Sequence, residues 1–167
     1  VPQHAFLRVP GGTGSPDSLA VNIFETARAT MVLNGRKVEL ELFLDPLELG
    51  HLTLTFANAA GNRFGLLLRT PAWAQPLRLQ VEGTAERGLL REGWTSLPPR
   101  VWKDGDRVSV RFNLSGRLVP GDHGNAGKAA LMWGPSVLAY DEAFNQDLGA
   151  PNGVGLAALP TGVSPVQ

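Results

Sequence analysis

The sequence predicts an all-β fold: an antiparallel β-sandwich, jelly-roll-like, that ends in a short irregular or helical C-terminal tail. Several segments alternate apolar and polar residues with a period of two, as strands do when one face is buried and the other is solvated. Glycine, asparagine and aspartate stand between these segments at turn positions. Long amphipathic helical patterns are missing, and no internal repeat indicates a propeller. Short strands with regular turns therefore favour a sandwich with jelly-roll-like connections.

The chain is expected to have three parts. Residues 1–18 form a flexible lead-in rich in glycine and proline, of which only Ala5–Val9 is expected to pair in a sheet. Residues 19–140 form the sandwich domain. Residues 141–167 form either a tail that straps across the sandwich or the truncated start of a following unit, with a short helix predicted at Asp141–Leu148.

The strands are predicted in chain order from alternation and turn chemistry. Asn34-Gly35 separates Ala29–Leu33 from Arg36–Leu44, and the pair predicts a hairpin because both of its residues tolerate positive φ. Further strands are predicted at Leu52–Ala57, Phe64–Arg69, Leu77–Glu82 and Arg107–Leu114. The turns that precede the second and the fourth of these strands are Gly61-Asn62 and Lys103–Asp106.

Composition excludes several classes of function. The 15 basic and 15 acidic residues cancel, so no long-range attraction draws nucleic acid or an anionic membrane, and neither partner is expected. The chain has no cysteine, which excludes disulfides, a thiolate nucleophile and a cysteine-rich zinc site. No cofactor is expected.

Val1–Phe6 lacks the pattern of a signal peptide, and a chain that begins with valine is expected to be a fragment of a longer protein.

The ionisable residues do not predict catalysis or a metal site. Asp104 and Asp106 share one turn, whereas the two acids of a glycosidase must flank the sugar from opposing sides. His4, His51 and His123 have no paired ligand at i+2 or i+4. We therefore expect no catalytic and no metal-binding residues. His123 lies in a glycine-rich loop, and it is a candidate sugar contact, with a solvated loop histidine as the alternative.

The four tryptophans offer a second route to carbohydrate. Indole faces stack on the apolar faces of sugar rings, and Trp73 and Trp94 follow turn residues, so both are candidates for carbohydrate binding. Trp102 and Trp133 lie in apolar segments and are expected to pack in the core or against another domain. The competing interpretation for every tryptophan is core packing, because large aromatic side chains dominate protein interiors.

Four segments in order resemble one family. Ala20–Phe24 (AVNIF) resembles its VNLY/VNLF stretch, and Leu68–Ala74 (LRTPAWA) is similar to its LRIPxWA signature. Val101–Leu114 (VWKDGDRVSVRFNL) resembles W-x-x-GD-x-V-x-L, and Asn125–Tyr140 (NAGKAALMWGPSVLAY) resembles N-x-G-(K/R)-(V/A)-A-L-x-(R/W)-GP. The family is glycoside hydrolase family 127, and the resemblance covers roughly residues 20–140.

The resemblance implies a place in a larger enzyme. Members of this family are retaining β-L-arabinofuranosidases and related enzymes that act on plant-type glycans. Their implied catalytic part is an (α/α)6 barrel with a cysteine nucleophile, a Cys/Glu zinc site and a glutamate acid/base, followed by β-sandwich domains. No residue of this chain matches that machinery. The resemblance therefore implies the C-terminal sandwich region, with the catalytic barrel missing.

Three functions are compatible with these observations. The first is a non-catalytic accessory sandwich that packs on the helical barrel of the parent glycoside hydrolase, and alone self-associates through its exposed barrel-facing surface. The second is a carbohydrate-binding module for arabinose-containing plant glycans, acting through Trp73 or Trp94. The third, a free-standing hydrolase with its own acid pair, is the least supported, because no acid pair is predicted. The fold does not choose among the three functions, since sandwiches host many functions.

Overall fold

A computed structural model describes residues 4–74 and 77–139 of the chain. The chain divides into two compact units between Asn113 and Leu114. This division lies inside the range 19–140 that the sequence assigns to a single sandwich. The predicted helix at Asp141–Leu148 lies outside the described residues.

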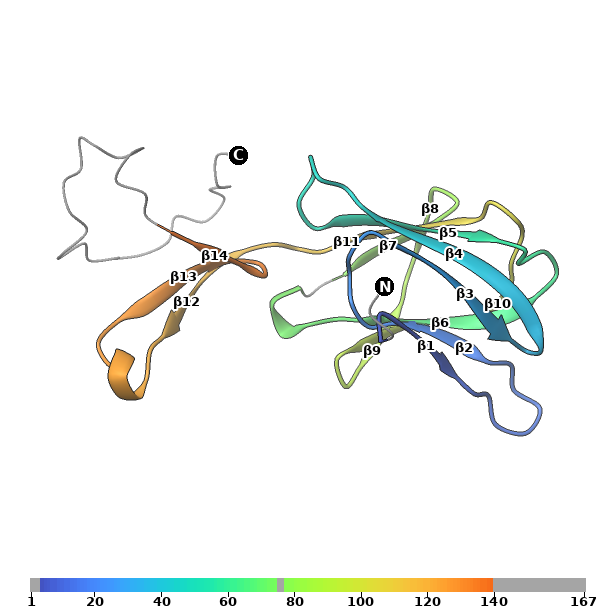
Figure 1. Cartoon of the computed structure of the whole chain (residues 1–167), viewed down its shortest axis with the longest axis horizontal. Helices are drawn as coiled ribbons and strands as arrows, with labels where there is room; N and C mark the ends of the chain where they lie inside the picture. Colours follow the sequence, from blue (N-terminus) through green and yellow to red (C-terminus); the bar gives the residue numbers. More distant parts are fainter. Residues whose placement is uncertain (1–3, 75–76, 140–167) are drawn as a thin grey trace. The chain divides into compact units, whose positions relative to one another are not determined.

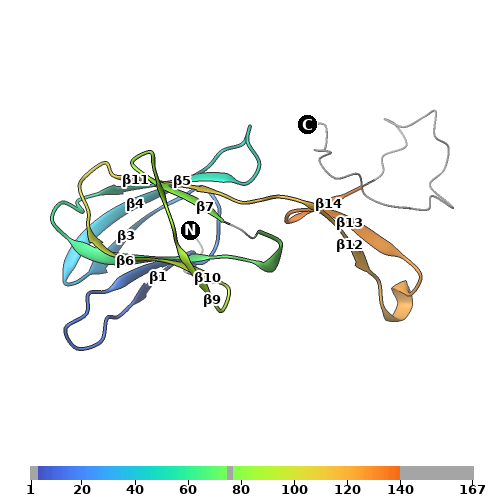
Figure 2. The ribbon, with the colours of Figure 1, turned by 180° about the vertical axis from the view of Figure 1, so that it is seen from behind.

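The first unit is built from two sheets (Figures 1 and 2). A five-stranded sheet has the order β1 (Phe6–Val9), β2 (Ser18–Val21), β6 (Arg63–Arg69), β10 (Trp94–Val101), β9 (Leu89–Arg91). A six-stranded sheet has the order β3 (Ala27–Leu33), β4 (Arg36–Leu44), β5 (His51–Ala57), β11 (Arg107–Arg111), β7 (Arg78–Val81), β8 (Thr84–Glu86). A short 3-10 helix, η1 (Ala72–Ala74), follows β6. The all-β sandwich predicted from the sequence is confirmed.

The chain passes repeatedly between the two sheets. It changes sheet after β2, after β5, after β6, after β8 and after β10. Most of the described strand pairs are antiparallel, but β2 and β6 run parallel, with Ala20 opposite Leu67. A parallel pair requires a long crossover connection, and the three strands of the other sheet, β3 to β5, supply it. Ala5–Val9, the pairing stretch expected in the lead-in, contributes β1.

The core fills the space between the two sheets. In β4, Val38, Leu40 and Leu42 are buried while their neighbours are exposed or half-buried, as the alternation predicts. The core side chains come from both sheets, and the largest of those that are fully buried are Trp102, Phe56, Phe64, Leu19, Leu33, Leu42, Leu52, Leu54, Leu66 and Leu68.

Turn chemistry explains where the strands end. Asn34 (φ 51°) and Gly35 (φ 76°) both have positive φ and connect β3 to β4, so the predicted hairpin is confirmed. Gly105 (φ 83°) lies in the turn before β11. In that turn, Asp106 accepts a hydrogen bond from the Lys103 N–H (2.9 Å), which closes it, as expected for a turn aspartate.

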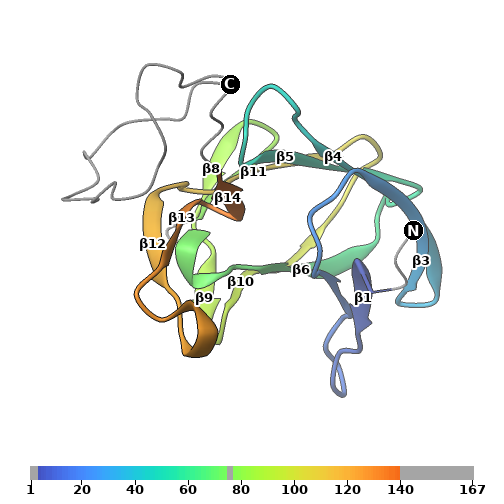
Figure 3. The same ribbon diagram turned by 60° about the vertical axis from the view of Figure 1, so that its left-hand side comes forward.

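The second unit holds a small antiparallel sheet, coloured orange in Figure 3. Its strands are β12 (Gly116–Pro120), β13 (Ala129–Trp133) and β14 (Ser136–Leu138), and a 3-10 helix, η2 (His123–Asn125), lies between β12 and β13. Arg117 donates a hydrogen bond to the Gly134 carbonyl (3.0 Å), which ties β12 to the turn after β13. In the described parts of the chain, no helix has the length and apolar character needed to cross a bilayer.

Candidate functional site

Trp102 is a core residue. Its side chain is fully buried, and its indole N–H donates a hydrogen bond to the Phe64 carbonyl at 2.9 Å. The ring stacks on Phe64, with centroids 5.4 Å apart, and lies 4.7 Å from Phe56. This placement agrees with the expectation that Trp102 packs in the core. Trp133, in β13 of the second unit, is half-buried.

Trp73 lies in η1 and is half-buried. Its ring centroid is 5.8 Å from that of Phe112, which in turn makes an edge-to-face contact with Phe24 at 4.9 Å. One part of the indole therefore packs on an aromatic cluster of the sandwich, while another part reaches the surface. A tryptophan held in this way can present a fixed ring face to a sugar.

Trp94 begins β10 and is half-buried on the outer face of the five-stranded sheet. It is paired with Arg69 at the end of β6, and the Arg69 guanidinium lies 5.5 Å from the indole centroid, within range of a cation–π contact. The Thr70 N–H donates to the Gly93 carbonyl at 2.7 Å. Because η1 follows β6 directly, Trp73 and Trp94 lie at the same end of β6.

His123 belongs to the second unit and is exposed. Its side chain is 92% exposed, and Nδ1 lies 3.4 Å from a carboxylate oxygen of Asp122. It has a positive φ of 47° in η2, so its backbone takes a turn conformation. These are the surroundings of a solvated loop histidine, the alternative that the sequence left open.

Asp104 and Asp106 hold turns. Asp104 accepts hydrogen bonds from the backbone N–H groups of Ala59 (2.7 Å) and Ala60 (3.1 Å), which ties the β5–β6 connection to the turn before β11. Asp106 accepts from Lys103 in the same turn. Both carboxylates are thus structural, in agreement with the turn interpretation of this segment.

The outer faces of the two sheets differ in chemistry. A row of paired residues crosses the five-stranded sheet through Leu7, Ala20, Leu67, Ser96 and Leu89. Leu7 is 36% exposed and Leu89 is 69% exposed. A corresponding row on the six-stranded sheet runs through Arg28, Glu41, Thr55 and Arg107. Along these rows the five-stranded sheet is mainly apolar and the six-stranded sheet is polar. Arg69 and Arg91 are the outward neighbours of Trp94 on the first sheet, and Val32 and Phe43 are exposed on the second.

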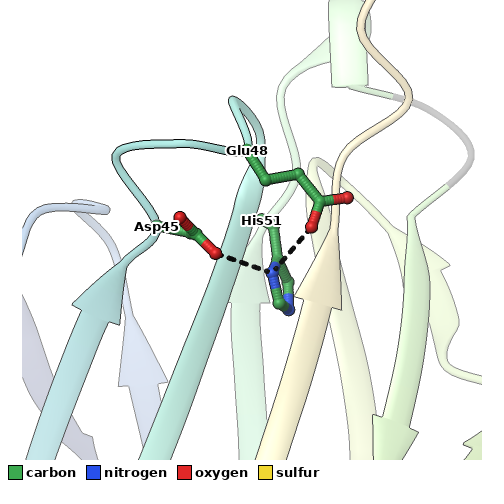
Figure 4. Close-up of side chains that lie close together, drawn as sticks. All are labelled: Asp45, Glu48 and His51. Carbon is green, nitrogen blue, oxygen red and sulfur yellow. Dashed lines mark ion pairs between the residues drawn. The ribbon is translucent and has the colours of Figure 1, made fainter.

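Sequence reasoning missed one cluster of ionisable side chains. Asp45 and Glu48 in the loop between β4 and β5 gather with His51, the first residue of β5, and each offers a ligand atom within 4.8 Å of the others (Figure 4). Paired metal ligands were expected only two or four residues after a histidine, whereas Glu48 and Asp45 stand three and six residues before His51. An Asp-x2-Glu-x2-His spacing across a short hairpin loop is the signal that finds them.

The first unit coincides with a known family. The sequence model described as the middle domain of β-L-arabinofuranosidases of glycoside hydrolase family 127 matches residues 18–114, which is more than half of the chain. The matched range ends one residue beyond the first unit. No curated protein sequence matches the chain significantly.

Solved structures of glycoside hydrolases are among those that resemble the chain. Ara127N-Se, a family 127 β-L-arabinofuranosidase from Geobacillus stearothermophilus T6, is 25% identical over 80% of this chain and 21% of its own, with a TM-score of 0.67. A second family 127 β-arabinofuranosidase is 23% identical over 74% of this chain and 23% of its own, with a TM-score of 0.61. A glycoside hydrolase that is 20% identical over 74% of this chain and 22% of its own shows the same fold, with a TM-score of 0.58. The chain thus spans about a fifth of the length of these relatives.

Proposed function

The chain belongs to glycoside hydrolase family 127, and from this premise we propose that its sandwich packs on and supports an (α/α)6 catalytic barrel carried by another part of the parent protein. The domain itself is non-catalytic. The parent is a glycoside hydrolase of the β-L-arabinofuranosidase type. The apolar outer face of the five-stranded sheet is the observation that supports this proposal.

That face is suited to contact with another domain. Leu7, Leu67 and Leu89 lie on one row across the sheet, and Trp94 lies beside them on β10. A sheet that faces water on its outer side normally carries polar residues there, as the six-stranded sheet does. A contiguous apolar patch on one side of a domain marks an interaction site. Burial against a helical domain removes this patch from water.

The described residues also explain why catalysis is assigned to the barrel. The two acids of the turn before β11 accept hydrogen bonds from backbone N–H groups, with Asp104 bound to Ala59 and Ala60. They share one turn, whereas the two acids of a glycosidase flank the sugar from opposing sides. The chain has no cysteine to serve as the nucleophile that the family resemblance implies.

A charge on the apolar face tests this proposal. Leu89→Glu in the parent protein is expected to lower the thermal midpoint of the whole enzyme, because a carboxylate is buried against the barrel. In the isolated chain, at a concentration low enough to keep it monomeric, the same substitution leaves the midpoint unchanged, since Leu89 is 69% exposed there. Differential scanning calorimetry of both proteins measures the difference.

The matched control is Gln80→Glu, which adds the same charge on the polar outer face of the six-stranded sheet. This substitution should leave the thermal midpoints of both the parent protein and the isolated chain unchanged. Sedimentation velocity gives a second readout, because the isolated chain is expected to self-associate through the apolar face and Leu89→Glu to reduce this association. A parent enzyme that tolerates Leu89→Glu as well as it tolerates Gln80→Glu contradicts the proposal.

The alternative function is a carbohydrate-binding module for arabinose-containing plant glycans. The observation in its favour is the position of Trp73 and Trp94 at the same end of β6, each half-buried and each braced, by Phe112 and by Arg69 respectively. Braced aromatic rings at a surface stack on sugar rings with little loss of side-chain entropy. His123 remains a candidate contact from the second unit.

Calorimetric titration with arabinan and arabinogalactan oligosaccharides decides between the two functions. If the domain binds sugar, Trp94→Ala is expected to weaken binding by tenfold or more, about 1.4 kcal/mol. Trp133→Phe is the control, because Trp133 belongs to β13 of the second unit and is not predicted to bind sugar. Saturable binding that Trp94→Ala and Trp73→Ala abolish would establish the binding module, and its absence favours the purely structural role.

A further inference from the structure

The β4–β5 loop carries an arrangement that the accessory role does not use. We propose that Asp45, Glu48 and His51 bind a divalent cation of the first transition row, with Zn²⁺ as the best match. The site is independent of the apolar face, since it lies at the edge of the polar outer face of the six-stranded sheet.

Each of the three side chains has one polar atom fixed by a neighbour. Oδ1 of Asp45 accepts the Leu47 N–H at 2.9 Å. Oε1 of Glu48 accepts from the Arg111 guanidinium. Nε2 of His51 lies 3.0 Å from Ser109 Oγ. The remaining oxygens of Asp45 and Glu48 both face Nδ1 of His51, as Figure 4 shows, and such outer partners are what orient the ligands of metal sites.

His51 provides the strongest sign that this group of atoms can hold a cation. Its Nδ1 is buried and has no hydrogen-bond partner. When Nε2 donates its proton to Ser109, Nδ1 keeps a lone pair, which is the form of histidine that binds metals. Two negatively charged carboxylate oxygens then face that lone pair, and they repel it. A cation bound between them attracts all three atoms.

The spacing of the three atoms fits a tetrahedral ion. Nδ1 of His51 lies 3.3 Å from Oε2 of Glu48 and 3.7 Å from Oδ2 of Asp45. Ligands at about 2.0–2.1 Å from zinc in a tetrahedron are about 3.3–3.4 Å from each other. The two separations from Nδ1 are therefore close to this value, and the two carboxylate oxygens, which lie within 4.8 Å of each other, can approach by side-chain rotation.

The backbone of the loop holds the ligands in place. The Asp45 N–H donates to the His51 carbonyl at 3.0 Å, and the His51 N–H donates to the Glu48 carbonyl at 3.0 Å. Gly50, with φ 82°, makes the turn back into β5. All three ligands thus come from one short closed loop, and little conformational entropy is lost when an ion binds.

The ligand set selects the class of metal. One imidazole nitrogen with two carboxylate oxygens suits Zn²⁺ and its neighbours, whereas Ca²⁺ and Mg²⁺ prefer oxygen alone. The two carboxylates carry the charge that balances a dication, and with Arg111 beside Glu48 the loaded site has a net charge of +1. Glu48 and His51, though not Asp45, also line a hollow of about 170 Å³.

Calorimetric titration of the chelator-treated chain with ZnCl2 tests the site. We expect one ion to bind per chain. Asp45→Asn and His51→Gln are each expected to weaken the affinity for Zn²⁺ about 100-fold or more, which exceeds the 10–100-fold loss caused by removing the outer partner of a ligand. With Co²⁺ as the probe, the visible absorption of a tetrahedral complex should appear in the wild type and be lost in both variants. Circular dichroism confirms that the variants are folded.

The matched control is His123→Gln, which removes the histidine of another pair with a carboxylate, Asp122 at 3.4 Å. It should leave the affinity and the Co²⁺ spectrum unchanged. Absence of binding at millimolar Zn²⁺, or binding that Asp45→Asn leaves intact, overturns the proposal. Neither result bears on the contact with the barrel, because Leu89 and the metal ligands lie on different sheets.

Discussion

Trp102→Ala is expected to lower the free energy of unfolding by about 3–5 kcal/mol, the range measured when a buried aromatic side chain is removed from a core. Trp102 is fully buried and packs against Phe56 and Phe64. Truncation leaves a cavity between the two sheets, and the lost contacts are not recovered because protein interiors relax only partly. It also leaves the Phe64 carbonyl without its indole donor.

Trp102→Phe separates the two contributions. Phenylalanine keeps an aromatic ring in the core but removes the indole N–H, so the cost is about 1–3 kcal/mol, the penalty of an unsatisfied buried carbonyl. Urea unfolding followed by far-ultraviolet circular dichroism measures both variants without relying on tryptophan fluorescence. Val101→Ala is the neighbouring control, because Val101 is 58% exposed and its truncation should change stability by less than about 0.5 kcal/mol. Equal effects of Trp102→Ala and Val101→Ala would contradict the assignment of Trp102 to the core.

Asp17→Ala is expected to lower the free energy of unfolding by about 2–4 kcal/mol, because it removes a buried carboxylate together with its charge-assisted hydrogen bonds. The Asp17 carboxylate accepts from Arg8 at 2.8 Å and from the backbone N–H of Asn34 at 2.7 Å. The Asp17 N–H donates to the Asn34 side chain at 2.8 Å. This exchange ties the β1–β2 connection of one sheet to the β3–β4 hairpin of the other.

The pH dependence of stability follows from the same contacts. The hydrogen bond from Arg8, and then that from the Asn34 N–H, lower the pKa of Asp17 from 3.8 to about 2. A carboxyl whose pKa is lower in the folded state stabilises the fold above its unfolded pKa. Its contribution is therefore complete above pH 3.8 and is lost as the pH falls toward 2.

Asp17→Asn isolates this effect. The difference in unfolding free energy between the wild type and Asp17→Asn should be constant from pH 7 to about 5 and should shrink between pH 4 and 2. Urea titrations at these pH values measure it. Glu41→Gln, which removes an exposed ion pair with Arg28 at 2.7 Å, is the control and should cost less than about 1 kcal/mol at any pH. A difference for Asp17→Asn that stays constant down to pH 2 is incompatible with the lowered pKa.

The strands and turns could be predicted from the sequence because they depend on neighbouring residues. Alternation in Arg36–Leu44 predicts which side chains are buried, and Asn34-Gly35 predicts the hairpin, since both rest on local backbone geometry. The interpretation of Asp104 and Asp106 as turn residues rests on the same local chemistry. The contact of Asp104 with Ala59 and Ala60, however, joins residues far apart in the chain.

The candidate sites show the limit of this local reasoning. Trp73 and Trp94 are 21 residues apart in the numbering, and only the pairing of β6 with β10 brings them to one end of the same strands. The cluster of Asp45, Glu48 and His51 is local in sequence, but its orientation depends on Ser109 and Arg111 of β11. No pattern within the loop predicts which distant strand will lie beside it.

The sequence by itself determined the class of the fold, the faces of its strands, its main turns and, through four ordered segments, its family. These features follow from short-range sterics and from the period with which apolar residues recur. The tertiary structure alone decided that β2 lies parallel to β6, that Asp17 meets Asn34, and that one sheet has an apolar outer face. The physical reason is that these contacts depend on which strands become neighbours. That choice is made by the joint burial of the whole core, to which each segment contributes only a part.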